Sequence, residues 1–298
     1  MQIWVIVTIL AAAVQTLRFT LQKRLKSLGL STGGATFSRF LFAFPLASFG
    51  ALLLMGVRGY AMPPLSPAFW GYVVAGGVGQ IVGTFCTVAL FSERSFAVGI
   101  AFTKTETVQV AAFSALFLGE AITGLGLTAI LIGLAGVLIL SRPPAGWGQG
   151  GIFNRAMGLG ILAGAFLGAS AIGYRGATLA VDNPDALFRA VLSLACVTAF
   201  QTLAMLAWLR LREPGQIAKV LSAWRATLPV GVTGVLGSLG WFTAFALQNA
   251  AYVRSVGQVE LIFSVLVSTL FFREKPTLRE VMGIGLLAVS IIMIVTVA

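Results

Sequence analysis

Two glutamates embedded in apolar sequence are the residues of this chain best suited to chemistry inside a membrane. Glu106 and Glu260 lie 154 residues apart, and they begin the segments ETVQVAAFSALFLGEAIT and ELIFSVLVSTLFFREKPT. At the same offset, further residue pairs are identical: Ala97/Ala251, Ser114/Ser268, Leu116/Leu270, Phe117/Phe271, Glu120/Glu274, Thr123/Thr277 and Ile130/Ile284. These matches indicate a duplicated membrane unit, and we expect its function where the two copies meet.

Each glutamate has two interpretations, because an ionised side chain near the bilayer centre costs at least ~2.5–3.5 kcal/mol. In the first, Glu106 and Glu260 are symmetry-related poles of a polar cavity that bind a substrate ammonium group or carry a proton. In the second, each is protonated or paired with a nearby arginine and locks the helix bundle. Lys104 lies roughly 200° around the helix from Glu106, so we expect it to face elsewhere.

The elements that position these residues are membrane-spanning helices. The chain of 298 residues is 58% hydrophobic and 10% charged, with a mean hydropathy of +0.97, whereas a soluble domain is about 25% charged. Ten apolar runs are long enough to span a bilayer: Ile3–Leu21, Gly33–Met55, Pro67–Phe91, Phe96–Leu118, Gly124–Leu140, Ala156–Ala177, Pro184–Leu209, Val220–Ala246, Ala250–Phe272 and Leu278–Val297. The sequence predicts an all-α integral membrane protein, with five spans in 1–141, a linker at 142–155 and five spans in 156–298.

An odd number of spans per copy predicts that the second copy is inverted relative to the first, around a central cavity. Thirteen basic residues fall in the odd-numbered loops, whereas the even-numbered loops carry Arg58 and Arg254, with Arg175 marginal. By the positive-inside rule the odd loops are cytoplasmic and both termini face outward. We expect a multi-pass protein of a bacterial inner membrane, without a cleaved signal peptide, present as a monomer or homodimer.

Several functions are disfavoured by what the chain lacks. It contains no histidine, which argues against His-based metal sites, and it has no GxxxxGK phosphate loop for ATP hydrolysis. Cys86 and Cys196 lie inside apolar runs and are expected to be buried hydrophobic residues. The net charge of +11 is expected to face anionic lipid and not nucleic acid. We therefore expect no enzymatic activity, no catalytic residue, no metal and no cofactor.

Other polar residues within the spans are candidates for contact with a substrate. Arg39 and its counterpart Arg189 each could hold a substrate carboxylate or extend to the membrane interface. The remaining candidates are Gln15, Arg18 and Phe19 on the first span, Gln80 and Thr84 on the third, Gln258 beside Glu260, and Tyr174 and Trp241 for stacking on a substrate ring. Candidates for gating are Pro45, which removes a backbone hydrogen bond, and Gly164 and Gly237 in small-residue patterns that allow helices to pivot.

The fourth and fifth spans and the ninth and tenth resemble the EamA unit of the drug/metabolite transporter superfamily. That unit ends an apolar helix in Leu118-Gly119-Glu120-Ala121-Ile122-Thr123 and continues into Gly133-Leu134-Ala135-Gly136, whereas the second copy departs to Phe272-Arg273-Glu274-Lys275-Pro276-Thr277 before Gly283. The resemblance implies a basket of spans one to four and six to nine, with spans five and ten peripheral, and transport without ATP. A proline common in that unit is replaced by Glu106 and Glu260. Among members, the chain looks most like YddG-type exporters of aromatic and other neutral amino acids.

The function predicted is a secondary transporter that exports small metabolites, aromatic and other neutral amino acids foremost, by alternating access. A zwitterion would suit a cavity that offers Glu106 together with Arg18 or Arg39, and transport is either facilitated diffusion or proton-linked. The alternative is an exporter of lipophilic drugs, sugars or phosphorylated compounds on the same fold. A membrane-embedded enzyme is the third hypothesis, and no nucleophile–base pair supports it.

Overall fold

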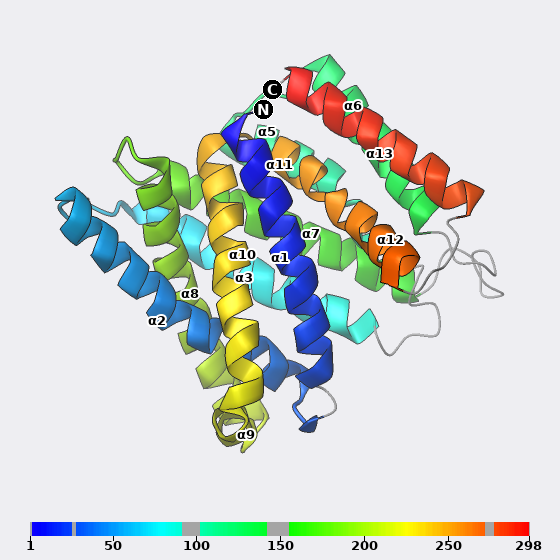
Figure 1. Cartoon of the computed structure of the whole chain (residues 1–298). Helices are drawn as coiled ribbons and strands as arrows, with labels where there is room; N and C mark the ends of the chain where they lie inside the picture. The colour runs from blue at the N-terminus through cyan, green and yellow to red at the C-terminus, as the bar shows by residue number, and fades with distance from the viewer. Residues whose placement is uncertain (1, 26–27, 91–101, 142–154, 272–276, 298) are drawn as a thin grey trace. The chain divides into compact units, whose positions relative to one another are not determined.

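The computed structural model describes residues 2–25, 28–90, 102–141, 155–271 and 277–297, and within them it has helices and no strand. In chain order (Figure 1) the helices are α1 Ile3–Leu25, α2 Thr32–Arg58, α3 Pro67–Leu90, α5 Glu106–Leu118, α6 Gly124–Leu140, α7 Arg155–Leu179, α8 Ala186–Arg212, α9 Gln216–Ser222, α10 Trp224–Leu247, α11 Ala250–Gly257, α12 Val259–Phe271 and α13 Leu278–Val297. The predicted linker lies outside the described residues, apart from its last residue, Arg155.

Six of these helices are long and apolar enough to cross a membrane: α2, α3, α7, α8, α10 and α13. Three apolar stretches are shorter, namely Ile3–Arg18, Glu106–Leu118 and Gly124–Leu140. The prediction of an all-helical membrane protein is therefore confirmed.

The described chain divides into two compact units. Unit 1 comprises Met1–Ile9, Val82–Ile172 and Gln248–Ala298, and unit 2 comprises Leu10–Ile81 and Gly173–Leu247. Each unit thus takes residues from both sequence copies. The two compact units therefore do not coincide with the two sequence copies.

In unit 1, helices α6 and α13 pack side by side and antiparallel (Figure 1). Ser290 of α13 donates a hydrogen bond to the carbonyl of Ala129 of α6 at 2.7 Å. Further along α6, a Cβ atom placed on Gly136 would lie 2.9 Å from the carbonyl oxygen of Gly283. Glycine is needed there because the two backbones approach more closely than any side chain permits.

In unit 2, α2 and α8 pack antiparallel along their lengths, and α10 packs against both. At one end of the pair, Ser31 caps α2 and also contacts the residues after α8: its hydroxyl donates to Glu213, and its backbone N–H donates to Gln216 Oε1 at 3.1 Å. At the other end, Tyr60 donates to Asp185, the N-cap of α8, at 3.3 Å. Hydrogen bonds therefore join α2 and α8, or the residues next to them, at both ends of this apolar helix pair.

The predicted spans four and nine are not continuous helices. Span nine is divided into α11 and α12 by a turn at Gln258, and span four is interrupted at Lys104–Thr105 before α5 begins. The two breaks are 154 residues apart when Lys104 is compared with Gln258. Gly257 precedes the second break, and the poor helix propensity of glycine favours an interruption there. Sequence analysis treated each of these two segments as a single span.

Thr123 and Thr277, which are equivalent residues of the two copies, each cap the helix that follows them. Thr123 caps α6 by accepting a hydrogen bond from the backbone N–H of Gly126 at 3.1 Å. At the start of α13, Thr277 and Glu280 form a reciprocal pair, in which each side chain accepts from the other residue's backbone N–H. This arrangement is a capping box. The motif residues Phe272 to Pro276 lie outside the described residues.

Candidate functional site

Glu106 is the most deeply buried carboxylate described in unit 1, with 4% of its surface exposed. It stands in the first turn of α5, where the N-terminal end of the helix favours negative charge. Arg254 of α11 approaches it, with Nη2 2.6 Å from both carboxylate oxygens, and donates a hydrogen bond to Oε2. Of the two interpretations made from sequence, the geometry matches the one in which an arginine neutralises this glutamate.

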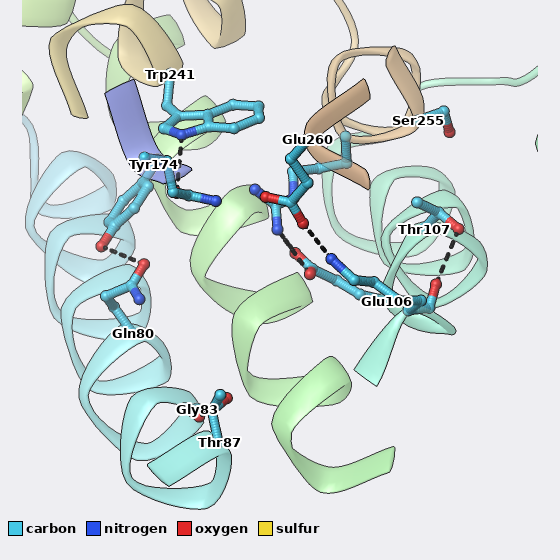
Figure 2. Close-up of polar contacts among 12 residues, drawn as sticks. Gln80, Gly83, Thr87, Glu106, Thr107, Tyr174, Trp241, Ser255 and Glu260 are labelled. Atoms are coloured by element: carbon cyan, nitrogen blue, oxygen red, sulfur yellow. Dashed lines mark hydrogen bonds and ion pairs between the residues drawn. The ribbon is translucent and has the colours of Figure 1, made fainter. Parts of the chain in front are cut away.

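Glu260 occupies the equivalent place in the first turn of α12 and forms an ion pair with Lys104 (Figure 2). Lys104 thus neutralises the glutamate of the other copy. This pair is more accessible than the first: the side chains of Lys104 and Glu260 are 16% and 17% exposed.

Each ion pair therefore joins a cation of one sequence copy to a glutamate of the other copy. Lys104 lies at the break in span four and Arg254 in the last turn of α11, and each pairs with the glutamate in the first turn of the helix that follows the other break. Sequence analysis assigned Arg254 to a loop, and this assignment is wrong, because the residue lies inside α11. Its position within an apolar run was the signal that could have identified it.

Gly164 of α7 packs directly on the break in span four. A Cβ atom on Gly164 would lie 3.1 Å from the carbonyl oxygen of Thr103 and 3.3 Å from the backbone nitrogen of Glu106. Gln258, at the other break, is buried, and its Oε1 has no hydrogen-bond partner among the described residues. Both candidates thus lie at the interruptions, whereas Thr84 lies half-buried on the unit 1 part of α3.

Unit 2 holds a second polar cluster, which contains Arg39. This arginine of α2 is 8% exposed, and its Nη2 donates to Ser238 Oγ of α10 at 3.1 Å. It is therefore bonded within the helix packing and is not extended toward an exposed helix end. No carboxylate among the described residues forms an ion pair with it.

Tyr174 adds an aromatic and hydrogen-bonded side to this cluster. Its ring stacks on Phe242 with 4.3 Å between centroids. Its hydroxyl accepts from Gln201 Nε2 at 3.0 Å and donates to Gln80 Oε1 at 3.5 Å, the latter contact being drawn in Figure 2. Gln201 is 2% exposed, and it is a site candidate that sequence analysis missed although a glutamine inside an apolar span was visible.

Trp241 and Gln15 form a further contact in unit 2, with Trp241 Nε1 3.1 Å from Gln15 Oε1 (Figure 2). Arg18, on the same helix as Gln15, is 4% exposed and donates to Gln22 at 3.1 Å. Gly234 of α10 lies between the two arginines: a Cβ atom there would be 3.0 Å from Arg39 Cγ and 3.7 Å from Arg18 Cδ. The side chain of Phe19 lies outside the described residues.

The side chains around Arg39 line a narrow crevice. It is lined by Arg39, Phe40, Ala43, Tyr174, Leu194, Val197, Thr198, Gln201, Ser238 and Phe242. No part of the crevice is wide enough for a water molecule, so the cluster is closed in this conformation. Arg39 is the one charged residue of the lining.

Arg189, expected from sequence to be the counterpart of Arg39, has a different task. Its Nη2 donates to the carbonyl of Ala246 at 3.2 Å, and Arg175 donates to the carbonyl of Phe245. Both carbonyls belong to the last turn of α10, where cations complement the helix dipole and satisfy the unpaired acceptors. Arg39 and Arg189 lie 150 residues apart and not 154, so they are not at equivalent positions of the two copies, and they do not share a role.

Two of the gating candidates are in ordinary helix surroundings. Pro45 lies inside α2, which continues without interruption on both sides of it. Gly237 of α10 has its nearest neighbour, Val14 Cγ1, at 3.5 Å from a placed Cβ atom, which is an ordinary van der Waals separation. Among the described residues no group of three or more metal-binding side chains occurs.

Comparison with known proteins finds a family match in the second half of the chain. Residues 154–296 match the model of the EamA-like transporter family. The first copy lies outside the matched residues. No curated protein matches the chain. A crystal structure of a protein is similar over 97% of this chain and 94% of its own, with a TM-score of 0.68 and 14% identity, a likeness that shows the fold alone.

Proposed function

We propose that this chain is a secondary transporter that exports small metabolites, aromatic and other neutral amino acids foremost, by alternating access. The carrying observation is the pair of broken helices, interrupted at Lys104–Thr105 and at Gln258, which are equivalent positions of the two copies. Interrupted helices at corresponding positions are the best pointer to a transporter's binding region, because their ends supply charges and unpaired backbone groups at membrane depth. The EamA-like domain at 154–296 supports the same function.

The ten spans are proposed to form two inverted repeats, comprising residues 1–141 and 156–298. The antiparallel packing of α2 with α8 and of α6 with α13 supports this, because each pair joins equivalent spans of the two copies. The odd loops are proposed to be cytoplasmic, in the bacterial inner membrane. Strong fluorescence from a C-terminal green fluorescent protein fusion would contradict this orientation, since that protein rarely folds after export.

The mode of transport proposed is facilitated diffusion. A proton carrier needs a carboxylate that can change its charge, and Glu106 and Glu260 are both held in ion pairs. The same pairing disfavours cationic drugs as substrates, because a buried cation requires an available carboxylate.

The test is uptake of labelled phenylalanine and tryptophan into liposomes that contain the purified protein, with and without an imposed pH gradient. We expect saturable uptake that needs no gradient and is absent from protein-free liposomes. Uptake that requires a gradient, and loses that requirement in Glu106→Gln, would replace facilitated diffusion by proton coupling. No uptake by folded protein under either condition would refute the amino-acid assignment and favour the drugs, sugars or phosphorylated compounds of the alternative.

A further inference from the structure

We infer that the guanidinium of Arg39 is a carboxylate-binding subsite, and that the protein recognises its substrates through the carboxylate and not through the ammonium group. This inference rests on the proposed transport function and specifies its substrate class. It extends to organic acids that carry no amino group at all, provided they have an apolar or aromatic body.

The hydrogen bonding of Arg39 is incomplete. A guanidinium has five N–H donors in a planar fork, and the described residues accept a hydrogen bond from one of those of Arg39, at Ser238 Oγ. Its guanidinium also lies 5.4 Å from the centroid of the ring of its neighbour Phe40. A charge that is buried to this extent is costly unless it is paired, and a bound carboxylate would supply two acceptors in the geometry that the fork fits.

The surroundings of Arg39 suit an organic acid better than a phosphate or an amine. Phosphate groups require several converging cations, and Arg39 is the one cation in the lining of the crevice, which does not include the nearby Arg18. An ammonium group requires an acidic partner, and the lining contains none. The stacked rings of Tyr174 and Phe242 offer an apolar surface for the body of the ligand.

A purely structural role for Arg39 is disfavoured by comparison with Arg189. Arg189 donates to the carbonyl of Ala246 at the end of α10 and thus completes a helix terminus. Arg39 caps no helix, and a serine hydroxyl that bonds it could be satisfied by a neutral residue. Because the crevice is closed in this structure, ligand entry requires the lining to separate, as alternating access demands.

The test compares three ligands that share a phenyl ring and differ in their charged groups: 3-phenylpropionate, phenylalanine and phenethylamine. Ligands that bind the folded protein raise its melting temperature by mass action, so purified protein in detergent suffices. We expect 3-phenylpropionate and phenylalanine to raise the melting temperature and phenethylamine to leave it unchanged. An equal shift with phenethylamine would overturn the inference without any variant.

The variants are Arg39→Gln, Arg39→Lys and the matched control Arg189→Gln. We expect Arg39→Gln to bind both carboxylates about 10- to 100-fold more weakly, the range for loss of a charged hydrogen bond, with Arg39→Lys intermediate and Arg189→Gln unchanged. Without ligand, Arg39→Gln should be at least as stable as the wild type, because it removes a buried unpaired charge. A structural arginine would instead lose stability.

The results separate the two proposals. Normal phenylalanine uptake combined with unaltered carboxylate binding by Arg39→Gln would refute the subsite and leave the transport function intact. Arg39-dependent binding of 3-phenylpropionate without any phenylalanine uptake would refute amino-acid transport and leave the subsite intact. Failure of wild-type protein to bind 3-phenylpropionate would refute the subsite.

Discussion

Replacing Arg254 by methionine tests whether the two ion pairs hold the broken helices in place. Methionine keeps most of the volume of the arginine stem but leaves Glu106 without its cation. Glu106 is 4% exposed, and Arg254 Nη2 lies 2.6 Å from its carboxylate. Removing one partner of a buried pair typically costs about 3–5 kcal/mol, because an uncompensated charge remains in a medium of low dielectric constant.

The double variant Glu106→Gln/Arg254→Met distinguishes this cause from simple loss of packing. With both charges removed, no charge is left unpaired, so we expect it to be more stable than Arg254→Met by at least ~1.4 kcal/mol, a factor of ten in the unfolding equilibrium. Lys104→Met should cost less than Arg254→Met, since the Lys104 and Glu260 side chains are 16% and 17% exposed and water can partly solvate the carboxylate that remains.

The assay is the free energy of unfolding in mixed micelles, measured by circular dichroism during titration with a denaturing detergent. The reasoning would be refuted if the double variant lost as much unfolding free energy as the sum of the losses in the single variants Glu106→Gln and Arg254→Met. Such additivity would mean that Glu106 and Arg254 stabilise the protein independently and that the pair carries no coupling energy.

The remaining predictions concern close packing and a helix cap. Gly164→Ala should cost about 1–3 kcal/mol of unfolding free energy and slow phenylalanine uptake, because its Cβ atom would lie 3.1 Å from the Thr103 carbonyl. Its control, Gly237→Ala, has 3.5 Å to its nearest neighbour and should raise the unfolding free energy by about 0.5–1 kcal/mol, because alanine favours a helix more than glycine does. Equal effects of the two alanines would contradict the packing argument. Asp185→Ala should cost ~1 kcal/mol by uncapping α8, and Tyr60→Phe should lower the unfolding free energy by less than that, since it leaves the cap itself in place.

The sequence by itself determined the class of the protein and the ends of several elements. Hydropathy identified an all-helical membrane protein because apolar length is a local property that needs no tertiary information. The repeated Thr123 and Thr277 marked the starts of α6 and α13, since a hydroxyl that caps a helix acts within three residues of itself. The 154-residue offset likewise marked Glu106 and Glu260 as equivalent positions, both of which lie in the first turn of a helix.

Tertiary structure alone decided the partners of those glutamates. Arg254 is separated by 148 residues from Glu106, and Lys104 by 156 from Glu260. Such partners meet only when segments from opposite sequence copies pack together, and no periodicity or spacing records that packing. Arg39 and Arg189 lie 150 residues apart and not 154, so the spacing already places them at non-equivalent positions. Only the packing of the helices, however, shows that Arg189 caps α10 and that Arg39 is buried beside a single hydroxyl, because these contacts join residues far apart in the sequence.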